Sequence, residues 1–129
     1  MSQAHLNATR RVLEAEINAG QIGHRFDAFF DPKVAFRDEL GTLNDRNDLR
    51  SYIQGFQDTF NGFRVEIEEV HDHGDTIMLV VDQTGEGEAS GVGVGQRFTW
   101  VLSFADDRCV RFEIYADHNE ALDAAGLSD

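Results

Sequence analysis

The sequence is poor in cysteine, proline and basic side chains. It has one cysteine among 129 residues, so no disulfide can form within the chain. Its one proline follows Asp31, where we expect it to end a helix. Lysine and arginine number 11 against 24 aspartates and glutamates, which leaves a net charge of −13. This balance disfavours nucleic acid and anionic membranes as partners, because both would be repelled.

Long apolar runs and targeting signals are also missing. No apolar stretch approaches the ~20 residues that a membrane-spanning helix needs. The first residues, Met-Ser-Gln-Ala-His, lack the basic and apolar parts of a signal peptide. We therefore expect a cytoplasmic protein that does not enter a membrane. A length of 129 residues suits one domain, residues 1–129, with a single core.

Phenylalanine is the residue that the chain has in excess, with 10 copies against 2 tyrosines and 1 tryptophan. A phenylalanine side chain has no polar atom that needs a partner. The excess therefore favours a dense core or an apolar pocket. The lone Cys109 stands at the start of a predicted strand, where we expect a small buried residue.

Hydrophobic periodicity divides the chain into a helical first half and a β-rich second half. We expect helices at residues 2–19, 22–30, 45–60 and 119–125, and strands at residues 33–38, 63–71, 76–88, 96–104 and 109–117. Asn44 or Asp45 can cap the third helix. The apolar phase of the second strand shifts at Glu68 and Glu69, which indicates a bulge. The glycine-rich residues 89–95 are expected to turn the chain.

This order of elements predicts an α+β fold, in which a curved antiparallel sheet wraps one face around the helices. Residues 76–81, Thr-Ile-Met-Leu-Val-Val, are apolar on both faces of their strand. Both faces of such a strand need cover. The helices can cover one face, and a second copy of the protein is the simplest cover for the other. We therefore expect a homodimer formed by the outer face of the sheet.

Three pieces of the sequence together resemble SnoaL-like domains of the nuclear transport factor 2-like superfamily, which includes the ketosteroid isomerases. They are Asn18-Ala-Gly20 after the first helix, Phe36-Arg-Asp38 on the short strand, and residues 110–127, a period-two strand that runs into a short helix. The resemblance implies a cystatin-like cone with a pocket at its wide end and a short C-terminal helix. It also implies frequent dimerisation through the outer sheet face.

The resemblance to the isomerases implies that Asp38 is a general base. Asp38 shares its parity with Val34 and Phe36, which aims it inward, and a carboxylate in an apolar pocket can move protons near neutral pH. The two oxyanion donors of the isomerases are replaced by Leu13 and Trp100. An indole N–H can still donate one hydrogen bond.

Relatives of other activities place their catalytic groups elsewhere. The polyketide cyclases carry an acid/base aspartate on the last strand, which corresponds to Asp117. The limonene epoxide hydrolases use an Asp-Arg-Asp set, for which Arg37, Arg111, Asp38 and Asp117 are the candidates.

The polar face of the last strand is the second predicted part of the site. Glu113 and Tyr115 share that face with Asp117 and are expected to line the cavity. The alternative is that this face meets solvent while Val110, Phe112 and Ile114 form core. The remaining residues that we expect to bind the ligand are Trp100, Phe36, Tyr52 and Phe56.

His71-Asp-His73 has the spacing of a pair of metal ligands on a strand. The segment is predicted to be a turn and has no third strong ligand adjacent, so we expect no metal and no other cofactor. The sequence thus predicts a protein that binds a small apolar ligand. We expect a cofactor-independent acid/base enzyme of isomerase or polyketide cyclase type acting on a small apolar carbonyl compound. The alternative is a non-catalytic ligand-binding or dimerisation module of the same fold.

Overall fold

The computed structural model describes residues 2–87 and 93–126. Over these residues the elements follow one another in this order: α1 (Ser2–Val12), η1, a π-helical turn (Leu13–Ile17), α2 (His24–Phe29), β1 (Phe30–Arg37), β2 (Thr42–Leu43), α3 (Arg46–Thr59), β3 (Phe60–His73), β4 (Thr76–Gly87), β5 (Gly93–Ala105), β6 (Arg108–Tyr115) and α4 (His118–Ala124). The predicted turn at residues 89–95 lies largely outside the described residues.

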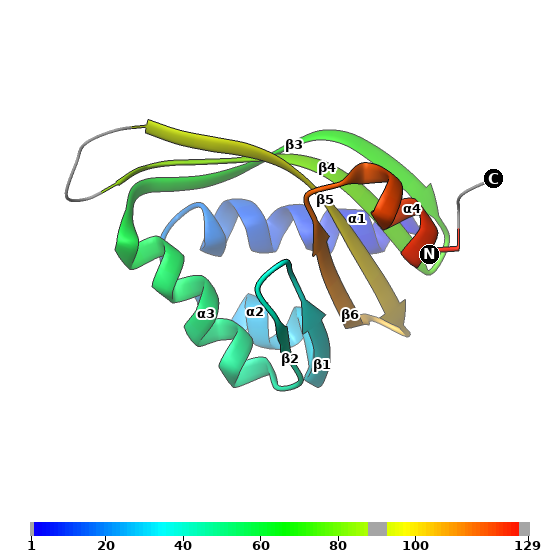
Figure 1. The fold of residues 1–129 in the computed structure, drawn as a ribbon. Helices are drawn as coiled ribbons and strands as arrows, with labels where there is room; N and C mark the ends of the chain where they lie inside the picture. Colours follow the sequence, from blue (N-terminus) through cyan, green and yellow to red (C-terminus); the bar gives the residue numbers. More distant parts are fainter. Residues whose placement is uncertain (1, 88–92, 127–129) are drawn as a thin grey trace.

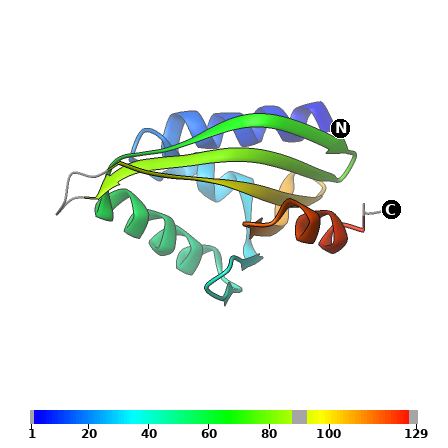
Figure 2. The same cartoon turned by 45° about the horizontal axis from the view of Figure 1, so that its top comes forward.

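The described strands form one curved sheet in the order β2-β1-β6-β5-β4-β3. Figure 1 shows β3, β4 and β5 as an arched layer with α1, α2 and α3 beneath it, and Figure 2 shows the same arch from above its edge. The α+β cone that the sequence predicted is therefore confirmed. One detail differs from the expected antiparallel sheet, because β1 pairs with β6 in parallel.

The parallel pairing decides which side chains of β1 and β6 lie opposite each other. Its register sets Phe36 opposite Phe112 and Arg37 opposite Glu113. Because side chains alternate along a strand, the two phenylalanines face the helices and the two charged residues face outward. The single partner of β1 on its other side is the short β2, where Phe36 lies opposite Leu43.

The inner face of the sheet and the three covering helices make the core. Its buried members include, from the sheet, Ile77, Leu79, Val81, Trp100, Leu102 and Phe112 and, from the helices, Leu6, Val12, Leu13, Ile17, Phe26 and Leu49. Phenylalanines connect the layers: the rings of Phe29 and Phe104 meet edge to face, with their centroids 5.6 Å apart. The phenylalanine excess is therefore used in the core as well as in the cavity described below.

The predicted first helix is interrupted by the π-helical turn η1. The amide of Asn18 donates to the carbonyl of Leu13 at 2.7 Å, across five residues. The turn places the buried carboxylate of Glu16, which is 5 % exposed, beneath the start of α2. There it accepts hydrogen bonds of 2.9 Å from the amides of Gly23, Arg25 and Phe26. A buried carboxylate thus satisfies amides that the start of a helix leaves unpaired.

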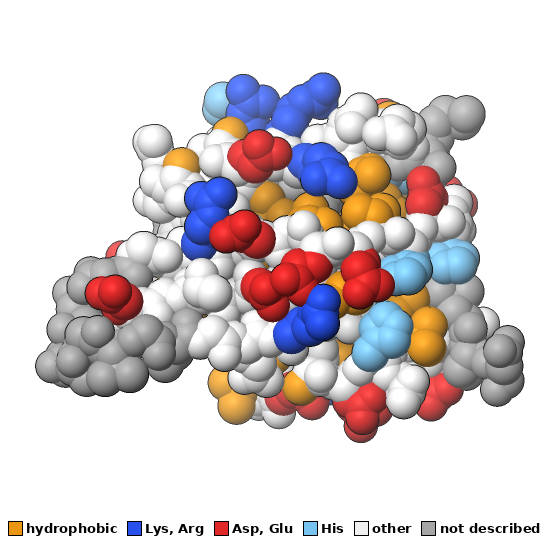
Figure 3. All heavy atoms as spheres, turned by 90° about the horizontal axis from the view of Figure 1, so that it is seen from above, with side chains coloured by type: hydrophobic (Ala, Val, Ile, Leu, Met, Phe, Trp, Pro, Cys, Tyr) orange, Lys and Arg blue, Asp and Glu red, His pale blue; other side chains and the backbone are white. Residues whose placement is uncertain are grey.

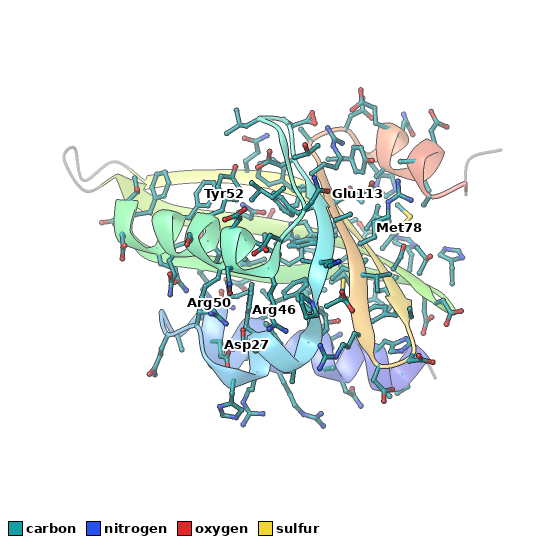
Figure 4. The ribbon with its side chains drawn as sticks, turned by 90° about the horizontal axis from the view of Figure 1, so that it is seen from below. Asp27, Arg46, Arg50, Tyr52, Met78 and Glu113 are labelled. Atoms are coloured by element: carbon teal, nitrogen blue, oxygen red, sulfur yellow. The ribbon has the colours of Figure 1, made fainter. Side chains whose placement is uncertain are left out.

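Helix α3 is held at both its start and its inner face. Asp45, one of the two predicted caps, accepts hydrogen bonds from the amides of Asn47 and Asp48. Two arginines of α3, Arg46 and Arg50, pair with Asp27 of α2, and Arg46 also donates to the carbonyl of Asp27 at 2.7 Å. Figure 4 shows these three side chains gathered between the two helices. This contact fixes α3 against α2 and so fixes the position of Tyr52, two residues after Arg50.

The bulge predicted at Glu68 and Glu69 is confirmed. The register of β3 against β4 shifts between Ile67 and Glu69. Ile67 lies opposite Val81, whereas Glu69 lies opposite Val80. The extra residue returns the apolar side chains of β3 to the inner face.

The outer face of the sheet is partly covered by α4 of the same chain. Met78 and Val101, which point outward from β4 and β5, are 0 % and 2 % exposed and pack with Ala121 of α4. Figure 3 shows the rest of this face, where acidic, basic and histidine side chains gather around a few apolar ones. The apolar outer side of β4 therefore does not require a second copy for its cover, since α4 supplies it. The homodimer itself stays a prediction.

None of the helices within residues 2–87 and 93–126 is both long enough and apolar enough to cross a membrane.

Candidate functional site

A cavity of about 320 Å³ lies between α3 and the inner face of the sheet. Its wall is almost wholly apolar, with a few polar side chains from β1, the loop after it, β4 and β5. The residues that line it are Ile17, Phe36, Asp38, Glu39, Leu40, Tyr52, Ile53, Phe56, Phe63, Val65, Gln83, Gln96, Phe98, Trp100, Phe112 and Ile114. An apolar cavity with a few polar groups is the usual form of a small-molecule site.

Asp38 and Tyr52 form a hydrogen-bonded pair in this wall. Asp38 follows the end of β1, and its parity with Phe36 turns it toward the helices. The hydroxyl of Tyr52, which projects from α3, donates to Oδ2 of Asp38. Figure 4 shows Tyr52 on α3 beside the sheet. The pair brings together a proton acceptor and a phenol within the cavity wall.

The other carboxylate oxygen of Asp38 organises the loop at the mouth. Oδ1 accepts from the amides of Leu40 and Gly41 at 2.8 and 3.1 Å, and the amide of Asp38 donates to the carbonyl of Gly41 at 3.0 Å. These are the contacts of a side chain that stabilises a turn. They fix the orientation of the carboxylate, so that Oδ2 is the oxygen directed to Tyr52.

The pKa of the Tyr52 phenol is raised above its ordinary value. The largest cause is burial, which disfavours the phenolate, and the hydrogen bond to Asp38 and its negative charge add to it. The phenol therefore stays protonated across the neutral range. It can keep donating to Asp38 while its oxygen retains the capacity to accept a hydrogen bond.

Trp100 and Gln83 place a second polar pair in the cavity wall. The indole N–H of Trp100 donates to Oε1 of Gln83 at 3.1 Å. An indole nitrogen can only donate, so the amide oxygen must face it and the NH₂ group must lie on the other branch of the side chain. The expected oxyanion donor, Trp100, is thus engaged by Gln83, and the Gln83 NH₂ is the donor that this pair can offer a ligand.

Aromatic rings make up most of the remaining wall. Phe36 lies between Tyr52 and Phe112, with ring centroids 5.6 and 5.2 Å away. Trp100 meets Phe112 at 4.8 Å, and Phe56 meets Tyr52 at 5.0 Å. The contacts are tilted or edge to face, which is the favoured geometry for aromatic pairs. The structure therefore brings Asp38 together with Trp100, Phe36, Tyr52 and Phe56 in one cavity wall.

Glu113 and Tyr115 do not lie in this wall, contrary to our expectation. They occupy the outer face of β6, whereas Phe112 and Ile114 of the same strand line the cavity. Tyr115 donates to Glu113 at 3.1 Å, and Glu113 is 6 % exposed. Figure 4 shows Glu113 on the α4 side of the sheet together with Met78. The physical reason is that the cavity is apolar, so the apolar face of the strand lines it.

Asp117 is likewise outside the cavity. It is an exposed residue that caps α4, and its Oδ1 accepts from the amide of Asn119 at 2.8 Å.

The Asp-Arg-Asp set is not assembled either. Arg111 donates to Glu113 at 2.8 Å on the outer face, and Arg37 lies over the ring of Tyr115, 4.2 Å from its centroid. The cavity thus contains neither arginine.

Two further predictions concern residues outside the cavity. Cys109 is fully buried, and burial raises the pKa of its thiol to about 12, so this side chain is a structural one. His71 and His73 were predicted to lie in a turn, but both belong to β3, and the turn itself is only Gly74 and Asp75. In the part of the chain that the structure describes, no three histidine, cysteine or carboxylate side chains gather as metal ligands do.

Several lining residues were not expected from the sequence. Gln83 and Gln96 come from β4 and β5, and Phe63 and Phe98 complete the aromatic wall. Trp100 and Phe98 share a parity in the sequence, which was a usable signal for Phe98. Gln83 had the same kind of signal, because it alternates with the inward Ile77, Leu79 and Val81 along β4.

The family model of the SnoaL-like domain matches residues 9–112. The chain belongs to the SnoaL-like family. Among solved structures, a proposed SnoaL-like polyketide cyclase from Jannaschia sp. CCS1 superposes with a TM-score of 0.79 at 14% identity, covering 99% of this chain and 94% of that one. AclR from Streptomyces galilaeus, a proposed hydroxylase, gives 0.77 at 14% identity, with 100% and 89% covered.

A third structure of the same fold comes from Catenulispora acidiphila. It is a ketosteroid isomerase-like protein in complex with trimethylamine, with a TM-score of 0.72, 14% identity and coverage of 99% of this chain and 96% of that one. A search of curated proteins finds no match to this SnoaL-like chain. At these identities the neighbours show the fold.

Proposed function

We propose that this SnoaL-like protein binds a small, mostly apolar carbonyl compound in the cavity and catalyses a cofactor-independent proton transfer on it. The observation that carries the proposal is the Asp38–Tyr52 pair in an otherwise apolar wall. A positioned carboxylate of this kind is a general base when a carbon acid lies beside it. The names of the structural neighbours support a reaction of this class.

The reaction begins when Asp38 takes a proton from a carbon next to the ligand carbonyl. The electron pair of the broken C–H bond forms a carbon–carbon double bond, and the carbonyl oxygen becomes an enolate oxygen. The NH₂ group of Gln83 is the donor available to that oxygen. Return of the proton to another carbon completes an isomerisation. Alternatively, the enolate carbon attacks a second carbonyl of the same ligand, the C=O π electrons move to its oxygen, and this alkoxide takes the proton back from Asp38 to complete a cyclisation.

Deuterium exchange tests the proton transfer without knowledge of the natural ligand. The protein is incubated with a small bicyclic ketone, 2-tetralone, in deuterated buffer, and mass spectrometry follows the exchange of the hydrogens next to the carbonyl. We expect exchange faster than in buffer alone, and loss of the acceleration in Asp38→Asn. Glu113→Gln is the matched control, because it removes an equal charge from the other face of the sheet.

The second candidate is a binding module without catalysis, favoured by the use of both oxygens of Asp38 in hydrogen bonds. Trp100 is the single tryptophan and lines the cavity, so its fluorescence reports occupancy. A ketone that changes the emission of Trp100 but gains no deuterium supports the module and contradicts the enzyme. A ketone that exchanges with equal speed in Asp38→Asn contradicts the role of Asp38.

Homodimerisation through the outer sheet face and a cytoplasmic location belong to the same proposal. Sedimentation velocity at micromolar concentration tests the dimer. A monomer would contradict it and would fit the cover that α4 gives to Met78 and Val101.

A further inference from the structure

The cavity carries negative charge and no positive charge. Asp38 and Glu39 belong to its wall, and none of the described residues that line it is a lysine, arginine or histidine. The nearest arginine in the sequence, Arg37, faces the other side of β1, where it lies over Tyr115 and 3.7 Å from Glu39. The wall therefore offers an anionic ligand no ionic partner.

Among the described residues, the carboxyl group of Asp38 has no ionic partner. Its three hydrogen-bond donors are the amides of Leu40 and Gly41 and the hydroxyl of Tyr52, all of them neutral groups. Over the described residues, no salt bridge includes Asp38, whereas Glu113 on the outer face is paired with Arg111. Of the two carboxylates, Asp38 in the cavity is thus the one that is free to attract a cationic ligand.

The walls around Asp38 are suited to the same kind of ligand. Aromatic faces carry negative electrostatic potential and attract cations within about 6 Å of the ring centroid. The rings of Phe36, Tyr52, Phe56, Trp100 and Phe112 all border the cavity. Their apolar area at the same time holds the uncharged part of a ligand.

We propose that the cavity selects its ligand by charge, and that the compound it takes is an apolar monocation with a tertiary or quaternary ammonium group. The inference rests on the proposed function, because it specifies the charge of the carbonyl compound that the same cavity receives. The ammonium group lies toward Asp38 at the mouth, and the apolar body lies against the aromatic wall. A carboxylate or phosphate compound of equal size is rejected, because its charge meets Asp38 and loses its hydration.

Three probes of nearly the same shape isolate the effect of charge. Phenyltrimethylammonium is a cation, tert-butylbenzene is its neutral isostere, and 4-tert-butylbenzoate is an anion. Binding is followed by the fluorescence of Trp100 at 0.15 M salt, a concentration at which a Debye length of about 8 Å screens the general negative charge of the protein. We expect the cation to bind about tenfold tighter than the neutral isostere, and the anion to bind more weakly than both.

Two variants of equal net charge locate the effect. Asp38→Asn and Glu113→Gln each remove one negative charge, but only the first removes it from the cavity. We expect the preference for the cation to fall to about threefold or less in Asp38→Asn, since the aromatic contribution remains, and to persist in Glu113→Gln. Equal preference in both variants would mean that the overall charge of the protein attracts the cation, and would overturn the inference.

The wild-type series separates this inference from the proposed function. Equal binding of the cation and the neutral isostere, or tighter binding of the anion, overturns the charge selection and leaves the apolar cavity as the ligand site. Failure of all three probes to alter Trp100 emission, together with no deuterium exchange of 2-tetralone, overturns both.

Discussion

The two faces of the sheet each carry a tyrosine hydrogen-bonded to a carboxylate. On the inner face Tyr52 donates to Asp38, and on the outer face Tyr115 donates to Glu113. The pairs have the same chemical groups, but Asp38 follows β1 and Tyr52 projects from α3, whereas Glu113 and Tyr115 both belong to β6. Their surroundings differ in charge and in access.

The outer pair is surrounded by positive charge and is covered by a helix. Arg111 bonds to Glu113, Arg37 lies over Tyr115, and Tyr115 packs in the same cluster as Ala121 of α4. The inner pair has neutral donors alone and borders a cavity. The inner pair is therefore a candidate site, because it borders an open apolar cavity and has no countercharge. The outer pair has the same groups but is surrounded by arginines and a covering helix, so it stabilises the fold.

The largest expected difference between the pairs is in catalysis. Asp38→Asn should lower the protein-dependent deuterium exchange of 2-tetralone by on the order of a hundredfold, because the amide cannot accept the proton. Glu113→Gln should leave the rate within about twofold once the folded fraction is taken into account. A similar loss in both variants, measured by mass spectrometry, would contradict the division of roles between the two faces.

Stability should show the opposite order. Glu113→Gln removes the ionic partner of Arg111 from a buried position, and we expect it to lower the free energy of unfolding by roughly 1–3 kcal/mol. Asp38→Asn keeps an amide oxygen for the turn and should cost less than about 1 kcal/mol. Urea denaturation of the two variants measures both values. A larger loss in Asp38→Asn would show that its turn contacts outweigh its role in the cavity.

Alkaline titration should sharpen the comparison at the tyrosines. The pKa of Tyr52 is raised by burial and by Asp38. A raised folded-state pKa contributes stability that is present below the unfolded value of about 10 and is lost as the pH rises above it. We expect Tyr52→Phe to lose less stability than the wild type over that alkaline range. Denaturation at several pH values tests this, and an unchanged slope would mean that Tyr52 ionises as it does in the unfolded chain.

The smallest expected effect concerns the arginine over Tyr115. Burial raises the pKa of Tyr115 and Arg37 opposes the rise. Arg37→Gln should therefore raise the pKa further, by a fraction of the effect of burial. Phenolate absorbance in the background of Tyr52→Phe, where Tyr115 is the remaining tyrosine, reports this shift directly. A pKa that falls instead would show that Arg37 acts on Tyr115 by packing.

The alternation of side chains along the first predicted strand was enough to predict that Asp38 faces the cavity. Asp38 follows Val34 and Phe36 at alternating positions, and a strand transmits that alternation faithfully. The cap at Asp45 and the bulge at Glu69 were equally local features. Each could be predicted because its cause lies within a few residues of the chain.

The last strand shows why the rest could not be predicted. Alternation along β6 separates Phe112 and Ile114 from Glu113 and Tyr115, but it does not say which face is hollow. That depends on where α3 leaves a gap and where α4 packs, and both are contacts between distant parts of the chain. The buried Glu16 has the same origin, because its partners at Gly23 and Phe26 meet it only after the chain reverses.

The π-helical turn at Leu13–Ile17 has a consequence for how this chain tolerates changes in length. A π turn holds one more residue than an α turn, so a single-residue deletion there would convert it to regular helix without breaking the element. The residues before the deletion would then be rotated and shifted relative to Glu16 and the chain that follows. The deletion would therefore change the rotation of one helical segment relative to the other without breaking the helix. Its cost in stability would appear in the contacts of the Glu16 carboxylate with the start of α2.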